Sequence, residues 1–452
     1  MKAHPPALRA YRGSLLHFVG DPGDGDDASA VQYFDDGLLV VENGLVKAAD
    51  EARLLLPSLP AGTQVVDHSG RLLTPGFIDT HIHYPQTDMI AAYAAQLLDW
   101  LDDHAFPAEH RFADAKHAAE SSRFFLDELM RNGTTTALVF GTVHPCSVDA
   151  FFTEAAARNL RMIAGKVLMD RNCPEHLRDT AHSGYRDSAA LIEKWHGRDR
   201  LHYAITPRFA LTSSDAQLES AGRLAAEHPG VFIHSHVAEN PKEVQRAREL
   251  FPQARSYLDV YERFGLLREG AVYAHCIHLD DEDRQRMAHT GAAAAVCATS
   301  NLFLGSGLFD FAAARHAGMR TGLGTDVGGG TSFSMLRTLA ETYKVAQMGG
   351  HRLTPWRSFY LATLGGARAL GLDDRIGSFA PGREADFIVL RMDSTPLIAR
   401  RMKTAHTPAE KLFALMMLGD DREIGATYIM GERIAGNLPP LSDSLPPGER
   451  GS

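Results

Sequence analysis

Histidine and carboxylate side chains recur in this sequence at spacings that suit a metal site. Catalytic Zn²⁺ takes imidazole and carboxylate ligands, leaves one position for water, and lowers the pKa of that water to about 7. A nearby aspartate can accept the proton of the water, and a separate glutamate can deliver a proton to the leaving side of a substrate. Six residues that could perform these tasks each lie at or just after a short apolar run: His81, His83, His236, Glu239, His275 and Asp326. Their types predict metal-assisted hydrolysis.

These six residues can act together only if their strands end at the same edge of a sheet. In the middle of the chain, short β-prone runs alternate with Ala-, Glu- and Arg-rich stretches of helical spacing. The eight predicted strands are Gly76–Asp79, Thr135–Phe140, Met162–Met169, His202–Thr206, Val231–His236, Ala271–His275, Ala294–Ala298 and Thr321–Gly324. The clearest predicted helices are Ala113–Arg131, Asp215–Glu227, Pro241–Leu250 and Asp280–His289.

Eight strand–helix units favour an α/β fold with a parallel, TIM-like (β/α)8 barrel. An open doubly wound sheet is the alternative. No G-x-G-x-x-G follows a strand, so nothing supports a dinucleotide site on such a sheet. A barrel of this kind builds its active site at the carboxyl ends of its strands, where the six residues are predicted to lie.

The spacing of the histidines agrees with that placement. Side chains two residues apart in a strand point to the same face, so His81 and His83 can enter the barrel mouth together. His234 shares a face with His236 but lies deeper, and it is predicted to be a packed barrel histidine. His278 lies beyond its strand and is predicted to be structural. The loop 304–307, LGSG, could cradle an anion, but a flexible loop or tight turn is the preferred interpretation.

The two ends of the chain differ from the middle. Residues 1–70 contain short apolar runs, such as Leu39–Val41 and Gly44–Lys47, divided by Gly, Asp and Asn, which is typical of short strands and tight turns. Residues 376–452 contain a predicted strand at Asp386–Leu390 and a hairpin around residues 428–434. We therefore predict a small composite β-sandwich domain from 1–70 and 376–452, with a tail, around a catalytic barrel at 71–375.

Composition excludes several classes of function. The 452 residues include 46 basic and 56 acidic side chains, and the net charge of −10 argues against a nucleic-acid partner. The four cysteines form no C-x-x-C pair, which fits a reducing cytoplasm. The N-terminal segment lacks the apolar core of a signal peptide, and no window approaches the roughly 18 apolar residues of a membrane span.

Together these motifs resemble the amidohydrolase superfamily of metal-dependent hydrolases. The likeness rests on PGFIDTHIH, H-x-H-x-x-E, a later A-H and G-T-D-x-G, and it covers nearly the whole chain, including the return IGSFAPGREADFIVL. Within the superfamily, several segments are similar to members that deaminate guanine: HIHYPQTDMI, LLDWLDDHAFPAEHRFAD, ITPRFALTSS, IHSHVAEN, SNLFLGSGLFD and GTDVGGGTSFSM. WLDDHAFPAEHRF is the most specific, because the metal chemistry does not require it.

The resemblance implies a role for each residue. One Zn²⁺ per chain, or Fe²⁺, would be bound by His81, His83, His236 and Asp326. His275 would orient the attacking oxygen, Glu239 would carry a proton to the ring, and Asp326 would act as the base. Gln86, Arg208 and Phe209 match substrate-binding positions. Trp100 is predicted to join them, and Phe106 could line the pocket, although helix packing explains both aromatics equally well.

The implied activity is hydrolysis of the C–N bond of guanine to give xanthine and ammonia, as in purine catabolism, by a cytoplasmic homodimer. Arginine donors suit a ring carbonyl, a glutamine amide can donate and accept, and a phenylalanine can stack on a base for roughly 1–3 kcal/mol. Two alternatives stay open: an amidohydrolase for another amino-heterocycle, such as an oxidised guanine, a pterin or an aminotriazine, and a non-catalytic scaffold. The zinc deaminases with H-x-E and P-C-x-x-C motifs are excluded, because the chain lacks both.

Overall fold

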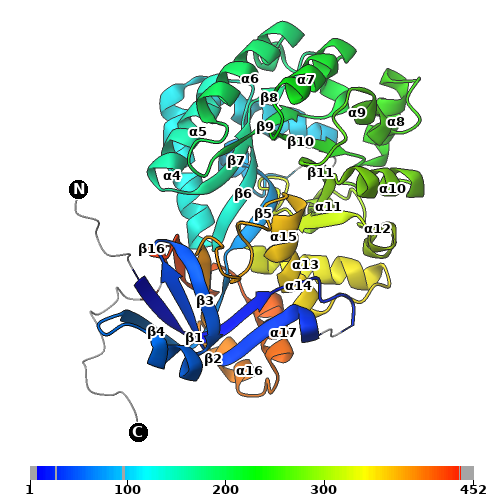
Figure 1. The fold of residues 1–452 in the computed structure, drawn as a ribbon. Helices are drawn as coiled ribbons and strands as arrows, with labels where there is room; N and C mark the ends of the chain where they lie inside the picture. The colour runs from blue at the N-terminus through cyan, green and yellow to red at the C-terminus, as the bar shows by residue number, and fades with distance from the viewer. Residues whose placement is uncertain (1–7, 26–27, 94–96, 437, 439–452) are drawn as a thin grey trace, which may run out of the picture.

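The computed structural model describes residues 8–25, 28–93, 97–436 and 438. Its central feature is a ring of parallel strands, in the hydrogen-bonded order β13-β12-β11-β10-β9-β7-β6-β5. The strands are β5 (Phe77–His83), β6 (Thr134–Phe140), β7 (Arg161–Gly165), β9 (His202–Pro207), β10 (Phe232–Val237), β11 (Ala271–His275), β12 (Ala293–Val296) and β13 (Arg320–Leu323). Each neighbouring pair is parallel. Helices surround this ring in Figure 1.

The first and last strands of the ring are tied together, which distinguishes a barrel from an open sheet. The hydroxyl of Thr80 donates to the carbonyl of Leu323 at 3.0 Å. Just beyond β13, the amide of Asp326 donates to His81 O at 3.0 Å, and the amide of His83 donates to Val327 O at 2.8 Å. The predicted TIM-like barrel is therefore confirmed, and the open doubly wound alternative is wrong.

Four of the longer helices begin where the sequence supplies a side-chain cap. Ser214 and Asn240 accept backbone hydrogen bonds at the starts of α7 (Asp215–Glu227) and α8 (Pro241–Leu250), whose predicted bounds are confirmed. Asp114 and Asp280 cap α4 (Ala115–Arg131) and α10 (Asp281–Thr290), so these helices start one or two residues later than predicted. The others are α1 (Ala52–Leu55), α2 (Leu97–Trp100), α3 (Phe106–His110), α5 (Pro145–Ala157), α6 (Ala181–Trp195), α9 (Tyr257–Arg263), α11 (Ala298–Phe303), α12 (Phe311–Ala317), α13 (Met335–Met348), α14 (Pro355–Ala362), α15 (Leu364–Ala369), α16 (Pro396–Met402) and α17 (Pro408–Leu418).

One predicted strand is divided in two. The run Met162–Met169 reads as continuous in sequence, but β7 ends at Gly165 and β8 (Val167–Leu168) pairs separately with β9. At Gly165 the chain passes so close to its neighbour that a Cβ would lie 1.8 Å from the carbonyl oxygen of Ala204. Lys166, the next residue, is fully buried and forms an ion pair with Asp179. Only the approach of the two strands reveals this break.

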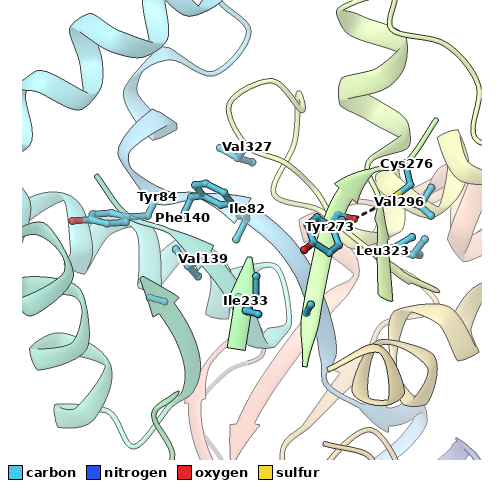
Figure 2. Close-up of a cluster of buried hydrophobic side chains, with 14 of the residues drawn as sticks. Ile82, Tyr84, Val139, Phe140, Ile233, Tyr273, Cys276, Val296, Leu323 and Val327 are labelled. Carbon is cyan, nitrogen blue, oxygen red and sulfur yellow. Dashed lines mark hydrogen bonds between the residues drawn. The ribbon is translucent and has the colours of Figure 1, made fainter. Parts of the chain in front are cut away.

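Buried apolar side chains fill the barrel wall and its helical cover. Ile82, Val139, Ile233 and Leu323 come from four different barrel strands and belong to one large core cluster (Figure 2). Ile82 lies between His81 and His83, so the alternation of a strand points it away from them. Burial of such side chains contributes about 25 cal/mol per Å² of apolar surface removed from water. The strand ends that carry the histidines are thereby held on a rigid wall.

A second sheet combines both ends of the chain, in the order β16-β15-β14-β4-β1-β2-β3. Its strands are β1 (Leu8–Phe18), β2 (Val31–Glu42), β3 (Leu45–Glu51), β4 (Gln64–Pro75), β14 (Phe387–Leu390), β15 (Ile424–Ile429) and β16 (Glu432–Ala435). Its blue N-terminal strands lie beside the barrel in Figure 1. Asn43 and Gly44 both have positive φ, 54° and 83°, in the turn between β2 and β3. Gly44 is therefore in a turn, not in the predicted strand.

Both ends of the chain contribute strands to this sheet, as predicted, whereas the domain boundaries stay predictions. β4 continues through residue 70, and the predicted hairpin near the C-terminus is formed by β15 and β16. The last residues of the predicted tail, 439–452, lie outside the described residues. Among the helices that the structure describes, none is long and apolar enough to span a membrane. All four cysteines are free.

Candidate active site

Three imidazoles and one carboxylate converge at the mouth of the barrel. Nε2 of His83, at the end of β5, lies 3.2 Å from Nε2 of His81 and 3.2 Å from Nε2 of His236 on β10. Oδ1 of Asp326, just after β13, lies 3.1 Å from Nε2 of His81 and 3.6 Å from Nε2 of His83. Polar atoms packed this closely need a cation or protons between them. Neutral imidazoles with a carboxylate are the donor set of a catalytic zinc site, so the residues fit a metal.

The protein holds each imidazole by its other nitrogen. Nδ1 of His236 donates to the carbonyl of Arg208 at 2.6 Å, Nδ1 of His81 lies 2.7 Å from Nε2 of His234, and Nδ1 of His83 lies 3.3 Å from Nε2 of Gln86. Such contacts fix the ring orientation of metal-binding histidines. Burial lowers the pKa of His83 and of His236 well below the ordinary value, which favours the neutral rings that a metal requires.

The glycines after Asp326 allow the loop to fold back on the site. Asp326 itself has φ of 52°, and its carbonyl accepts from the amide of Gly330 at 2.5 Å. A Cβ at Gly330 would lie 1.7 Å from Thr325 O, and one at Gly328 would lie 2.7 Å from Gln86 O. The G-T-D-V-G-G-G motif therefore combines a carboxylate with the small residues that its tight turn requires.

Two further predicted residues stand beside the cluster. Nε2 of His275, at the end of β11, lies 3.4 Å from Glu239 Oε2 and 3.9 Å from Asp326 Oδ2. Nδ1 of His275 donates to Oδ1 of Asn301 at 2.8 Å, which fixes its ring. Burial raises the pKa of Glu239 above that of an ordinary glutamate, an effect that His275 opposes. A buried carboxyl group with a raised pKa is suited to carrying a proton at neutral pH.

A pocket of about 410 Å³ opens beside these groups. Gln86, Arg208, Phe209 and Trp100 all line it, together with the apolar side chains of Leu97, Leu101 and Leu304. The indole NH of Trp100 donates to the carbonyl of Ala92 at 3.1 Å. Phe106 lies behind the pocket wall, 5.2 Å from the guanidinium carbon of Arg208. A pocket that combines apolar walls with a few directed polar groups is typical of a small-molecule site.

The family of the chain follows from this geometry and from comparison with known proteins. A model of the amidohydrolase family matches residues 72–434. The chain belongs to the amidohydrolase family. The predicted superfamily is confirmed, and it consists of metal-dependent enzymes, in agreement with the His/Asp cluster at the barrel mouth.

Individual amidohydrolases resemble this one closely. A guanine deaminase of Escherichia coli is 50% identical over 428 residues, which cover 94% of this chain and 98% of that protein. The solved structure of E. coli guanine deaminase superposes with a TM-score of 0.92 at 49% identity, and the match covers 95% of this chain and 99% of that one. A guanine deaminase from C. acetobutylicum, solved with bound guanine in its active site, has a TM-score of 0.85 at 26% identity, covering 95% of this chain and 100% of that one.

The structure also places beside the site residues for which the sequence predicts no catalytic or binding role. In this amidohydrolase, Ser306 lies in the LGSG loop, and its hydroxyl donates to Oε1 of Glu239 at 2.9 Å. His278, predicted to be structural, lies with Nε2 3.0 Å from the carbonyl of Ser306. Gly305 and Gly307 have φ of 65° and 136°, so the loop is a tight turn, as preferred. In the sequence, only the position of Ser306 between two glycines could have drawn attention to it.

Glu243 is a second such residue. Its Oε2 accepts from the amides of Glu239 at 2.8 Å and Asn240 at 3.2 Å, and its Oε1 accepts from the hydroxyl of Tyr257 at 2.7 Å. Burial and the neighbouring Glu239 raise the pKa of Glu243 to about 7. Its spacing from Asn240 is that of a capping box, and this spacing could have indicated its role from the sequence. Glu243 therefore holds the backbone that carries Glu239.

Proposed function

We propose that this amidohydrolase is a guanine deaminase, which converts guanine and water into xanthine and ammonia. The observation that carries the proposal is the 50% identity to an E. coli protein of that name over 98% of its length. The relative with guanine in its active site supports the same substrate. The predicted substrate-binding residues Gln86, Arg208, Phe209 and Trp100 share one pocket, which adds support from geometry.

The metal is proposed to be one Zn²⁺ per chain. His81, His83, His236 and Asp326 would hold it, because their donor atoms converge and burial lowers the pKa of all three imidazoles, which favours their neutral form. Fe²⁺ suits the same donors and would be distinguished by metal analysis of the purified protein. When bound, the ion supplies a Lewis acid that makes water a nucleophile near neutral pH.

The side chains around the pocket can then move the protons. Glu239 gives its proton to N3 of the ring while the oxygen of water adds to C2, and Asp326 takes the proton that this water releases. The proton of Asp326 passes to the exocyclic amine, the C2–N bond breaks and ammonia leaves. The hydroxyl group on C2 then gives its proton to Glu239, which leaves the carbonyl of xanthine and returns Glu239 to its protonated form. His275, 3.4 Å from Glu239 and 3.9 Å from Asp326, lies where it can orient the new oxygen.

Recognition is proposed to come from the pocket wall. Arginine offers only donors, so Arg208 suits the O6 carbonyl of guanine. Phe209 and Trp100 present apolar faces to the flat ring, a contact of roughly 1–3 kcal/mol per base. The amide of Gln86 already bonds within the protein: Nε2 donates to Glu109 at 3.0 Å, and Oε1 accepts from the amide of Gly328 at 3.2 Å. Direct contact between Gln86 and the substrate would require one of these bonds to be exchanged.

Two rival functions have separate tests. An amidohydrolase for a pterin or an aminotriazine would share the metal cluster, so only substrate profiling separates it from a guanine deaminase. A non-catalytic scaffold would be expected to have lost metal ligands, whereas every predicted ligand is present here. The experiment is ammonia release from a purine and pterin panel, with metal content measured on the same sample. We expect about one metal per chain and guanine as the preferred substrate; no release from guanine would contradict the proposal.

Glu239→Gln is the companion variant, because it retains the shape of the side chain but removes the carboxyl proton. We expect its kcat to fall by about 10²-fold or more, on the scale of general acid catalysis. We further propose that the protein is a homodimer and that it lies in the cytoplasm. The four free cysteines support only the compartment, because disulfides are rare in a reducing environment. Sedimentation of the purified protein tests the dimer.

A further inference from the structure

A buried glutamate joins two of the predicted substrate-binding residues. Glu109 lies on α3, inside the segment WLDDHAFPAEHRF, and its side chain is 1% exposed to solvent. Nη1 of Arg208 donates to both of its oxygens, at 2.8 and 2.7 Å, and Nε2 of Gln86 donates to Oε1 at 3.0 Å. Glu109 does not line the pocket. It therefore contacts the recognition side chains from behind.

These contacts hold the guanidinium of Arg208 from two directions. Glu109 binds one terminal nitrogen, and Phe106, one turn earlier on the same helix, lies with its ring 5.2 Å from the guanidinium carbon. A guanidinium is planar, so fixing one nitrogen and one face determines where the other donors point. Within the described part of the chain, Nε and Nη2 of Arg208 have no hydrogen-bond partner in the protein, and Arg208 lines the pocket.

The pair also sets the charge at this end of the pocket. Both side chains are buried, at 3% and 1% exposure, so neither charge is screened by water. An unpaired arginine in such a place would attract an anion. With Glu109 against it, Arg208 keeps free donors for a neutral carbonyl, while the net charge of the pair is zero.

We propose that Glu109 is the positioning residue of the pocket: it orients Arg208 and Gln86 and makes their end of the pocket select an uncharged ring carbonyl over an anion. The proposal rests on the proposed function for the identity of the ring. It gives a reason for the specific segment WLDDHAFPAEHRF, which the metal chemistry does not explain. In this proposal Glu109 acts on the substrate only through the side chains that it holds, whereas Arg208 contacts the substrate directly.

The test is a double-substitution cycle with Glu109→Gln, Arg208→Met and the double variant, assayed for kcat and KM. Glutamine keeps the size of the side chain but loses its charge. We expect KM for guanine to rise about 10- to 100-fold in Glu109→Gln, with a smaller change in kcat, since small misplacements of binding groups cost up to about 10²-fold. In the Arg208→Met background, Glu109→Gln should change KM less than 3-fold, because Arg208 is gone and Gln86 is still held through its bond with the amide of Gly328.

A second readout is inhibition by urate, a purine anion near neutral pH. Its inhibition constant relative to the KM for guanine should fall at least 10-fold in Glu109→Gln, because the charge of Arg208 is no longer balanced. The matched control is Asp179→Asn, which breaks the buried ion pair of Asp179 with Lys166 outside the pocket lining. This control should lower thermal stability but leave KM and urate inhibition unchanged.

Several outcomes would overturn the proposal. One is a KM for guanine within 2-fold of wild type in Glu109→Gln. Another is an equal rise of KM in Asp179→Asn. A third is a double variant whose fold-change in KM equals the product of the fold-changes of the two single variants. If Glu109→Gln does not fold, Glu109→Leu combined with Arg208→Met replaces the ion pair by apolar groups, and Arg208 restored into that background should not recover KM. If the wild type releases no ammonia from guanine, the proposed function is rejected instead. KM would then be measured for the same variants with the heterocycle that the panel identifies as the substrate.

Discussion

Nε2 of His234 lies 2.7 Å from Nδ1 of His81, and both side chains are fully buried. If His81 offers Nε2 to a metal, its proton is on Nδ1 and is donated to His234. His234 then carries its own proton on Nδ1, which has no hydrogen-bond partner among the described residues. A histidine predicted only to pack in the barrel therefore orients a predicted metal ligand.

His234→Leu should weaken metal binding about 10- to 100-fold, the usual cost of losing the partner of a metal-binding histidine. His234→Gln is the matched variant, because its amide oxygen can accept the proton of His81 from a similar position. Metal retained after dialysis against graded chelator concentrations measures the effect, and circular dichroism checks the fold. Equal affinity in His234→Leu and the wild type would contradict the prediction.

Ser306→Ala should lower kcat about 10-fold with little change in KM. The hydroxyl of Ser306 is the side-chain donor that holds Oε1 of Glu239, at 2.9 Å, and a misoriented proton carrier slows the chemical step more than binding. Ser188→Ala is the control, because that buried hydroxyl has no hydrogen-bond partner in the described structure. The two variants should have similar melting temperatures; a kcat for Ser306→Ala equal to that of Ser188→Ala would reject the role.

Acid should destabilise the fold through buried histidines away from the active site. Burial lowers the pKa of His17 to about 4, against an ordinary value of 6.5. Between pH 6.5 and pH 4 the unfolded chain binds a proton at this histidine that the folded chain does not bind. The free energy of unfolding that His17 contributes is therefore present at pH 7 and is lost as the pH falls toward 4. The full shift corresponds to about 3 kcal/mol. His68 and His202, with pKa values also lowered to about 4, act in the same direction.

His17→Gln should remove the contribution of His17 to this pH dependence. Between pH 7 and pH 4.5 the variant should therefore lose about 2 kcal/mol less unfolding free energy than the wild type. Urea unfolding at both pH values measures it. His316→Gln, a change at an exposed histidine on α12, should leave the pH dependence as in the wild type. A steeper pH dependence in His17→Gln than in the wild type would show that the sign is wrong.

Metal removal should lower the melting temperature as well as activity. A ligand that binds only the folded state adds about 4 kcal/mol of stability when its free concentration is 1,000 times its Kd. Without metal, the four donors at the barrel mouth also face one another uncompensated, since Nε2 of His83 lies 3.2 Å from Nε2 of His81 and 3.2 Å from Nε2 of His236. Calorimetry before and after chelation, with stoichiometric zinc added back, measures the effect; an unchanged melting temperature would argue against a metal at this cluster.

The sequence by itself determined the barrel, the strand ends that carry His81, His83, His236 and Asp326, and the bounds of α7 and α8. These features are encoded locally. Strand alternation places residues two apart on one face, and caps such as Ser214 and Asn240 mark where helices begin. The predicted members of the site converge because parallel strands in a barrel all end at the same edge.

Only the tertiary structure decided which side chains support that site. Glu109 meets Arg208 across 99 residues, Ser306 meets Glu239 across 67, and His234 meets His81 across 153. Each pairing depends on how separate strand–helix units pack, and no periodicity in the sequence records the choice of partner. The same holds for the division of β7 from β8, which follows from the close approach of Gly165 to Ala204. Local patterns encode elements and faces, whereas long-range packing selects the contacts that orient the chemistry.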